Sequence, residues 1–341
     1  MRALAAVLVL AVPVAAADDP AEAEKLMEQA QTAYRNRDFA GALGLAQKAE
    51  KLDPKNAAAP FVAGLAHDKL RHNAETLKAL TRAVELDPRN ATAFDRRGDA
   101  KLKLGKFADA VADFDKFLEM RPDAAPEHWR RGIALYYAGR FDDGRKQFES
   151  HRKVNPEDVE NAAWHYLCNA RATNPKKARE ELIPVTRDVR VPMKQVLELF
   201  AGKLKPQDVL DAAEKADLKD EPLKEARFYA HLYVALYYES EGDAKKALEH
   251  LTTAVEKYKI GHYMWDVGNA HLMTLRSKND QCPMTHQGMT KDKGPMTKQG
   301  GCCFSAFGLL PSCFLGGSLV GHWALVISPR SPVALSIDKV P

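Results

Sequence analysis

The chain has 341 residues, with 50 Lys and Arg against 46 Asp and Glu, and a formal net charge of +4. Such a balance argues against a nucleic-acid-binding protein, which would need a clustered basic face. The five cysteines include no Cys-x-x-Cys pair, and their odd number disfavours a zinc site, a redox site or a complete disulfide framework.

The first seventeen residues predict a secretory signal peptide. Arg2 gives a positive start, residues 3–12 form an apolar stretch, and Ala15–Ala17 precede Asp18. A membrane-spanning helix would need roughly 20 apolar residues. We therefore expect cleavage after Ala17, an exported protein that is periplasmic or secreted, and a fold confined to residues 18–276.

In the next part of the chain, four prolines recur at a constant interval of 34 residues: Pro54, Pro88, Pro122 and Pro156. Proline lacks the backbone N–H and restricts the residue before it, so each is predicted to end a helix. Counting back from them defines four units, 23–56, 57–90, 91–124 and 125–158. One position in each unit is always small: Ala30, Gly64, Gly98 and Gly132.

This pattern resembles the tetratricopeptide repeat (TPR) family. The resemblance implies an all-α fold, a right-handed solenoid of helix-turn-helix units. After residue 158 the period loosens into divergent helices over 159–226, and a late TPR-like unit with a cap follows at 227–276. In this part we expect helices near residues 161–172, 176–183, 193–201, 206–216 and 263–275.

The late unit has an aromatic-rich run at residues 229–238, followed by Gly242-Asp243, and Trp164–Leu167 form an earlier aromatic helix. In this order the features resemble the bacterial NlpI family of TPR envelope lipoproteins over residues 23–276. The resemblance implies a non-enzymatic adaptor that brings peptidoglycan hydrolases to a processing protease. The lipidated cysteine of that family is absent here, which argues against a lipid anchor.

In a TPR solenoid the first helix of each unit lines a concave groove. The residues predicted to bind a partner there are Tyr34, Arg35, Phe61, Leu65, Lys69, Arg96, Asp99, Lys103, Trp129, Arg130, Ile133 and Tyr137. Aromatic residues and Arg dominate interface hot spots. We expect Arg96 and Arg130, one repeat apart, to pair with acidic side chains of the partner. Packing of any single aromatic between units remains an alternative.

Chaperone-binding TPR domains use asparagines to clamp a terminal carboxylate. Gln31 and Val62 occupy those positions here, so this kind of clamp is not expected.

The sequence has no His-Glu-x-x-His, phosphate-binding glycine loop or Gly-x-Ser-x-Gly motif, and predicts no enzyme, cofactor or metal. His262, Asp266 and His271 come nearest to a metal site, but their spacing is poor. A hydrolase using the His262 region is a remote alternative, and a self-assembling structural subunit is the second function considered. A homodimer remains open. Cys168 is predicted to pack as a small hydrophobic residue.

From residue 277 the composition changes to Gly, Thr, Met and Pro, and no charged residue lies between Lys298 and Arg330. The tail 277–341 is predicted to lie outside the fold. It is interpreted as a translated non-coding or frameshifted segment, with a disordered extension and a membrane anchor as the alternatives.

Overall fold

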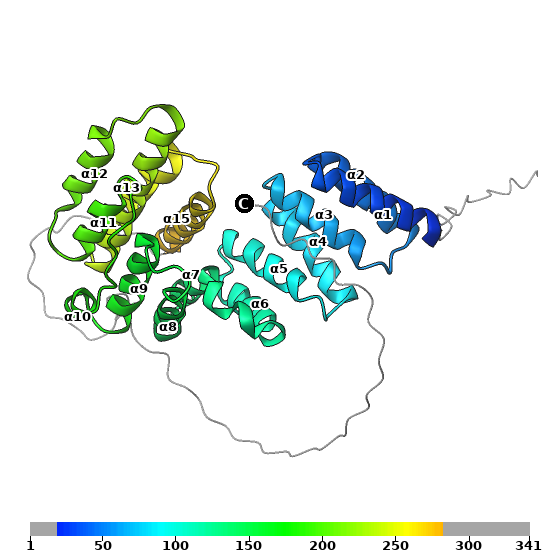
Figure 1. The fold of residues 1–341 in the computed structure, drawn as a ribbon, viewed down its shortest axis with the longest axis horizontal. Coiled ribbons are helices and arrows are strands. Elements are labelled where there is room, and N and C mark those ends of the chain that lie inside the picture. The colour runs from blue at the N-terminus through cyan, green and yellow to red at the C-terminus, as the bar shows by residue number, and fades with distance from the viewer. Residues whose placement is uncertain (1–18, 282–341) are drawn as a thin grey trace, which may run out of the picture. The chain divides into compact units, whose positions relative to one another are not determined.

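The computed structural model describes residues 19–281, and within that range every regular element is a helix (Figure 1). The predicted signal peptide and residues 282–341 of the tail lie outside the described residues. The repeat region contains α1 (Pro20–Arg35), α2 (Phe39–Leu52), α3 (Ala58–Lys69), α4 (Asn73–Leu86), α5 (Ala91–Lys103), α6 (Phe107–Met120), the 3₁₀ helix η1 (Pro122–Glu127), α7 (Trp129–Tyr137) and α8 (Phe141–His151).

The first three prolines end helices as predicted. Helices α2, α4 and α6 stop at Leu52, Leu86 and Met120, each two residues before its proline. Each first helix packs against the second helix of its own unit and against its neighbours along the chain. The solenoid of TPR units follows from these local stop signals.

In the second, third and fourth units the small residue is a glycine that lies under a bulky side chain sixteen positions later. A Cβ added to Gly64 would lie 2.7 Å from Leu80, one on Gly98 would lie 2.8 Å from Phe114, and one on Gly132 would lie 2.6 Å from Phe148. All three distances are shorter than a carbon–carbon contact. Glycine is therefore required where the two helices of these three units cross, whereas the first unit has Ala30 opposite the small Ala46.

The fourth unit departs from the expected boundaries. Its first helix, α7, begins only at Trp129, because the preceding residues form η1 with Pro126 inside it. Its second helix, α8, ends at His151, five residues before Pro156. A turn follows, in which the Asn155 N–H donates to the His151 carbonyl at 2.9 Å. Pro156 therefore follows a turn and does not itself end the helix.

The divergent part contains α9 (Val159–Ala172), α10 (Pro175–Glu180), α11 (Met193–Phe200) and α12 (Pro206–Lys215), close to the predicted ranges. Helix α9 is central to the core, and residues 161–170 are all buried. Cys168 lies there as a free thiol with 0% exposure, which confirms its predicted packing.

The last part contains α13 (Asp220–Ser240), α14 (Ala244–Thr252), the π-helix η2 (Thr253–Lys257) and α15 (Tyr263–Gln281). Helix α15 runs five residues beyond the predicted end of the fold at 276. The sequence offers no Gly or Pro after Arg276 before Pro283, so nothing local stops the helix earlier.

One extended core joins buried residues from Leu102 to Leu272, and a smaller alanine-rich core holds α1, α2 and α3 together. Among the described helices, none combines the length and the apolar character needed to cross a lipid bilayer.

Candidate functional site

The predicted groove is divided by the last helix. Helix α15 packs against α5, the first helix of the third unit, as well as against α14 and η2. Its apolar side is firmly held, because Met264, Val267, Ala270 and Leu272 are at most 3% exposed. Helix α15 therefore lies against α5, the helix that carries the predicted groove positions of the third unit (Figure 1).

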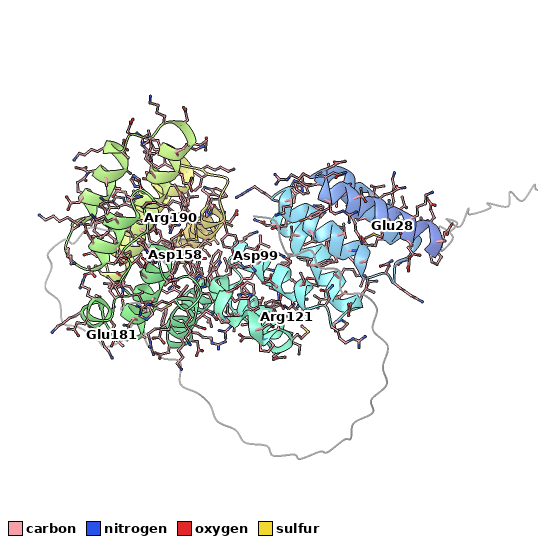
Figure 2. The ribbon with its side chains drawn as sticks, in the orientation of Figure 1. Glu28, Asp99, Arg121, Asp158, Glu181 and Arg190 are labelled. Atoms are coloured by element: carbon pink, nitrogen blue, oxygen red, sulfur yellow. The ribbon has the colours of Figure 1, made fainter. Side chains whose placement is uncertain are left out.

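Asp99, which is labelled in Figure 2, joins α15 to the repeats through a buried ionic network. Lys103 Nζ lies 2.7 Å from Asp68 Oδ1 and 2.8 Å from Asp99 Oδ2, and the Tyr263 hydroxyl donates to Asp99 Oδ1 at 2.6 Å. Burial alone would raise the pKa of Asp99, but Lys103 and Arg130 outweigh it and hold the pKa below its ordinary value. Asp99 is thus an ionised carboxylate, satisfied within the protein.

Asp95 forms a second network one turn earlier on α5. Arg130 Nη2 donates to both of its carboxylate oxygens, at 2.8 and 2.9 Å, and His128 Nε2 lies 3.0 Å from Oδ1. Burial would raise the pKa of Asp95, but Arg130 and the His128 hydrogen bond lower it well below its usual range. The carboxylate partner of Arg130 therefore belongs to this chain.

A third contact links α15 to the second unit. Arg71, in the turn after α3, donates from Nη2 to Asp266 Oδ1 at 2.7 Å, and its guanidinium lies 5.5 Å from the Trp265 ring centroid. Burial raises the pKa of Asp266, and Arg71 offsets this only in part. Charged side chains therefore connect the second and third units to α15, and the fourth unit to the third.

Half of the predicted groove residues are buried in the core or contact other residues of the same chain. Trp129 packs edge-on against Tyr263 with ring centroids 5.1 Å apart, and Tyr137 stacks on Phe107 at 4.6 Å. Ile133 is 1% exposed and belongs to the core, so its prediction as a groove residue is corrected. Together with Asp99, Lys103 and Arg130, these residues face internal partners.

The other half stays accessible, and we call it the open groove end: Tyr34, Arg35, Phe61, Leu65, Lys69 and Arg96. Arg35 and Lys69 are exposed, and Tyr34, Phe61 and Leu65 are half-buried. The Arg96 side chain is 38% exposed and only loosely paired, with Nε 3.9 Å from Asp95 Oδ2.

Tyr34 packs edge-on against Phe39 of its own unit, with ring centroids 5.3 Å apart. Burial raises the pKa of its hydroxyl, while Arg96 lowers it and Asp68 raises it. Tyr34 on α1 therefore lies within electrostatic reach of both α3 and α5. The first helices of adjacent units also contact one another directly, α1 with α3 and α3 with α5.

The prediction that Arg96 and Arg130 together bind acidic side chains of a partner needs correction at Arg130. Reversing the charge of Arg130 would leave Asp95 buried beside a second negative charge, so a variant with Arg130→Glu would lose stability whether or not a partner binds there. The acidic residues Asp68 and Asp95, each 35 positions before its cation, were the signal of internal pairing that sequence reasoning missed.

The three residues considered for a metal site do not converge. The His262 Nδ1 lies 2.9 Å from the Tyr229 hydroxyl, Asp266 pairs with Arg71, and His271 Nε2 lies 3.2 Å from Glu239 Oε2. Across residues 19–281, no group of three or more His, Cys, Asp or Glu side chains is arranged to hold a metal ion.

Comparisons with known proteins agree with the repeat assignment. The family model described as tetratricopeptide repeat matches residues 27–91 and 96–130. No curated protein matches the chain.

Solved structures with a similar arrangement include a tetratricopeptide repeat protein from Parabacteroides merdae, 17% identical, covering 75% of this chain and 99% of that one, with a TM-score of 0.49. Another is YrrB, described as a TPR protein with an unusual peptide-binding site, 15% identical, covering 75% and 93%, with a TM-score of 0.40. The first TPR of Spaghetti, bound to an HSP90 peptide, is 27% identical over 30% and 82%, with a TM-score of 0.30. The matched segments and the 34-residue helix pairs around them identify this part of the chain as a solenoid of tetratricopeptide repeats.

Proposed function

We propose that the protein is an exported, non-enzymatic TPR scaffold that binds protein partners in the cell envelope through the open groove end. One observation carries the proposal. Of the groove positions, those in the third and fourth units pair mostly with residues of the same chain, whereas Tyr34, Phe61 and Lys69 of the first two units remain accessible. Accessible aromatic and basic residues are typical of interface hot spots.

The partner class follows from the sequence resemblance. An NlpI-like scaffold would bring an envelope protease together with a peptidoglycan hydrolase, and both are the first partners to test. Export is proposed from the predicted signal peptide. It requires that the mature protein begin after Ala17 and be recovered from the envelope or the medium.

A photo-crosslinking residue placed at Phe61 tests the proposal. In an envelope extract it should capture a discrete protein, identified by mass spectrometry and then reconstituted from purified components. The same residue placed at Lys78, exposed on the second helix α4, is the matched control. Identical products at both positions, or none at Phe61, would contradict the proposal. A large regular oligomer of this chain alone would favour a structural subunit.

A further inference from the structure

One repeat position carries a cation in three successive units. Arg35, Lys69 and Lys103 are 34 residues apart, and each is the last residue of the first helix of its unit, α1, α3 or α5. Because the units repeat the same backbone, the three side chains leave equivalent points of neighbouring helices. They form a row across the groove, which we call the basic row.

Lys103 shows what this position does when carboxylates are present. Its ammonium group lies between Asp68 and Asp99, at 2.7 and 2.8 Å, and its side chain is only 9% exposed. Burial would lower the pKa of Lys103, but the two carboxylates outweigh it and raise the pKa. At the third unit the chain itself supplies both counter-charges.

The first two units lack these counter-charges. Asp68 precedes Lys103 by 35 residues and Asp99 precedes it by four, and the same intervals counted back from Lys69 give Tyr34 and Leu65, which carry no charge. Both Arg35 and Lys69 are exposed. Within residues 19–281, neither has a carboxylate oxygen within 4.0 Å, and Arg35 donates instead to the Thr32 hydroxyl at 2.9 Å.

We propose that an acidic segment of a protein partner crosses the ends of α1 and α3 and supplies the carboxylates for Arg35 and Lys69 that Asp68 and Asp99 supply for Lys103. This inference rests on the proposed function and names the chemistry of the partner. Phe61 and Leu65 are half-buried on the same first helix as Lys69, and offer apolar contact to the rest of the segment. The nearly even charge balance of the chain favours such a segment over a polynucleotide, which would need a larger clustered basic face.

The geometry also sets a spacing. Packed helices lie about 8–10 Å apart and α1 contacts α3, so we expect the backbone positions that carry Arg35 and Lys69 to be separated by about that distance. A chain in the polyproline II conformation has three residues per turn and rises about 3.1 Å per residue, so residues i and i+3 lie on one face about 9 Å apart. The preferred segment therefore has two acidic residues separated by two others.

Fluorescence anisotropy on the full chain tests the proposal with short synthetic peptides whose C-terminus is amidated. One peptide has two glutamates at i and i+3 beside a phenylalanine, a second has them at i and i+1, and a third replaces both with glutamine. Amidation removes the terminal carboxylate, so binding reports on side-chain carboxylates alone. We expect the i, i+3 peptide to bind best, more weakly as salt is added, and the glutamine peptide to bind about tenfold less tightly, a few-fold for each exposed ion pair.

The matched variants are Arg35→Glu with Lys69→Glu, and as a control Lys48→Glu with Lys78→Glu, which make the same charge change on the second helices of the same units. The first pair should weaken binding at least tenfold and the control less than twofold, with equal helicity by circular dichroism. If the first pair unfolds the protein, Arg35→Gln with Lys69→Gln replaces it.

Unchanged binding in the Arg35 and Lys69 variants, an equal loss in the control, or equally tight binding of an oligonucleotide would overturn the inference. The two experiments distinguish a failure of the proposed scaffold function from a failure of the proposed acidic segment. If crosslinking at Phe61 captures a partner but acidic peptides do not bind, only the acidic segment is wrong. If crosslinking at Phe61 captures nothing, the scaffold function itself is wrong.

Discussion

Asp95→Asn is expected to lower the free energy of unfolding by about 3 kcal/mol. Asp95 is 5% exposed and accepts hydrogen bonds from Arg130 at 2.8 and 2.9 Å, with His128 at 3.0 Å. Asparagine keeps the shape but removes the charge that balances Arg130. Breaking a buried ion pair costs about 3–5 kcal/mol. The lower end applies because the Arg130 side chain remains 21% exposed and Asp99 lies 3.8 Å away.

Urea denaturation followed by far-ultraviolet circular dichroism measures this loss. The control is Lys116→Gln, which removes an ion pair of similar length, 2.7 Å to Glu119, between side chains that are 49% and 64% exposed. The control should lose less than about 0.5 kcal/mol, because exposed pairs contribute little. Equal losses in the two variants would refute the view that Asp95 and Arg130 belong to the fold and not to the partner site.

Three further predictions concern packing, pH and reactivity. Gly132→Ala should lower the free energy of unfolding by about 1–3 kcal/mol, because its Cβ would lie 2.6 Å from Phe148. The control Gly44→Ala, with nothing within 4 Å of the added Cβ, should raise the free energy of unfolding by about 0.5–1 kcal/mol. A lower free energy of unfolding in both variants would contradict the view that the close contact with Phe148 is what requires glycine. The pKa of Asp99 is lower in the folded state than in the unfolded state, so the ionised carboxylate stabilises the fold above about pH 4, and this stabilisation is lost as the pH falls further. The difference in melting temperature between wild type and Asp99→Asn should therefore shrink on acidification. A difference that stays constant with pH would contradict the ionised state of Asp99. Burial raises the pKa of the Cys168 thiol, so an alkylating reagent should label this residue only in denaturant. Peptide mapping by mass spectrometry separates it from the other four cysteines, and rapid labelling of Cys168 in the native protein would show that α9 is not packed as described.

The sequence was a good guide where the determinants are local. The ends of α2, α4 and α6 follow from prolines two residues further on, and the glycine positions follow from the fixed interval to a bulky residue in the same unit. Each of these signals acts within one unit of 34 residues. The first helices of the first three units were therefore correctly placed, whereas α7 begins later than the repeat predicts.

The position of α15 could not be read in the same way. Its contacts join Tyr263 to Asp99 and Asp266 to Arg71, residues 164 and 195 positions apart, and no short-range pattern encodes such a pairing. The aromatic and acidic residues of α15 indicate an amphipathic helix but do not specify its partner helix. As a result, the prediction treated the whole groove as available, whereas the structure leaves only the first two units and Arg96 accessible.

Hydrogen–deuterium exchange on the full chain, with and without the partner captured at Phe61, tests most directly whether binding occurs at the open groove end. Our account predicts slower exchange in α1 and α3, spanning residues 20–35 and 58–69, with α15 and the second helices α2 and α4 unchanged. Slower exchange confined to α7 and α15, or faster exchange in α15, would contradict it, because either result would place the partner on the part of the groove that the protein itself occupies.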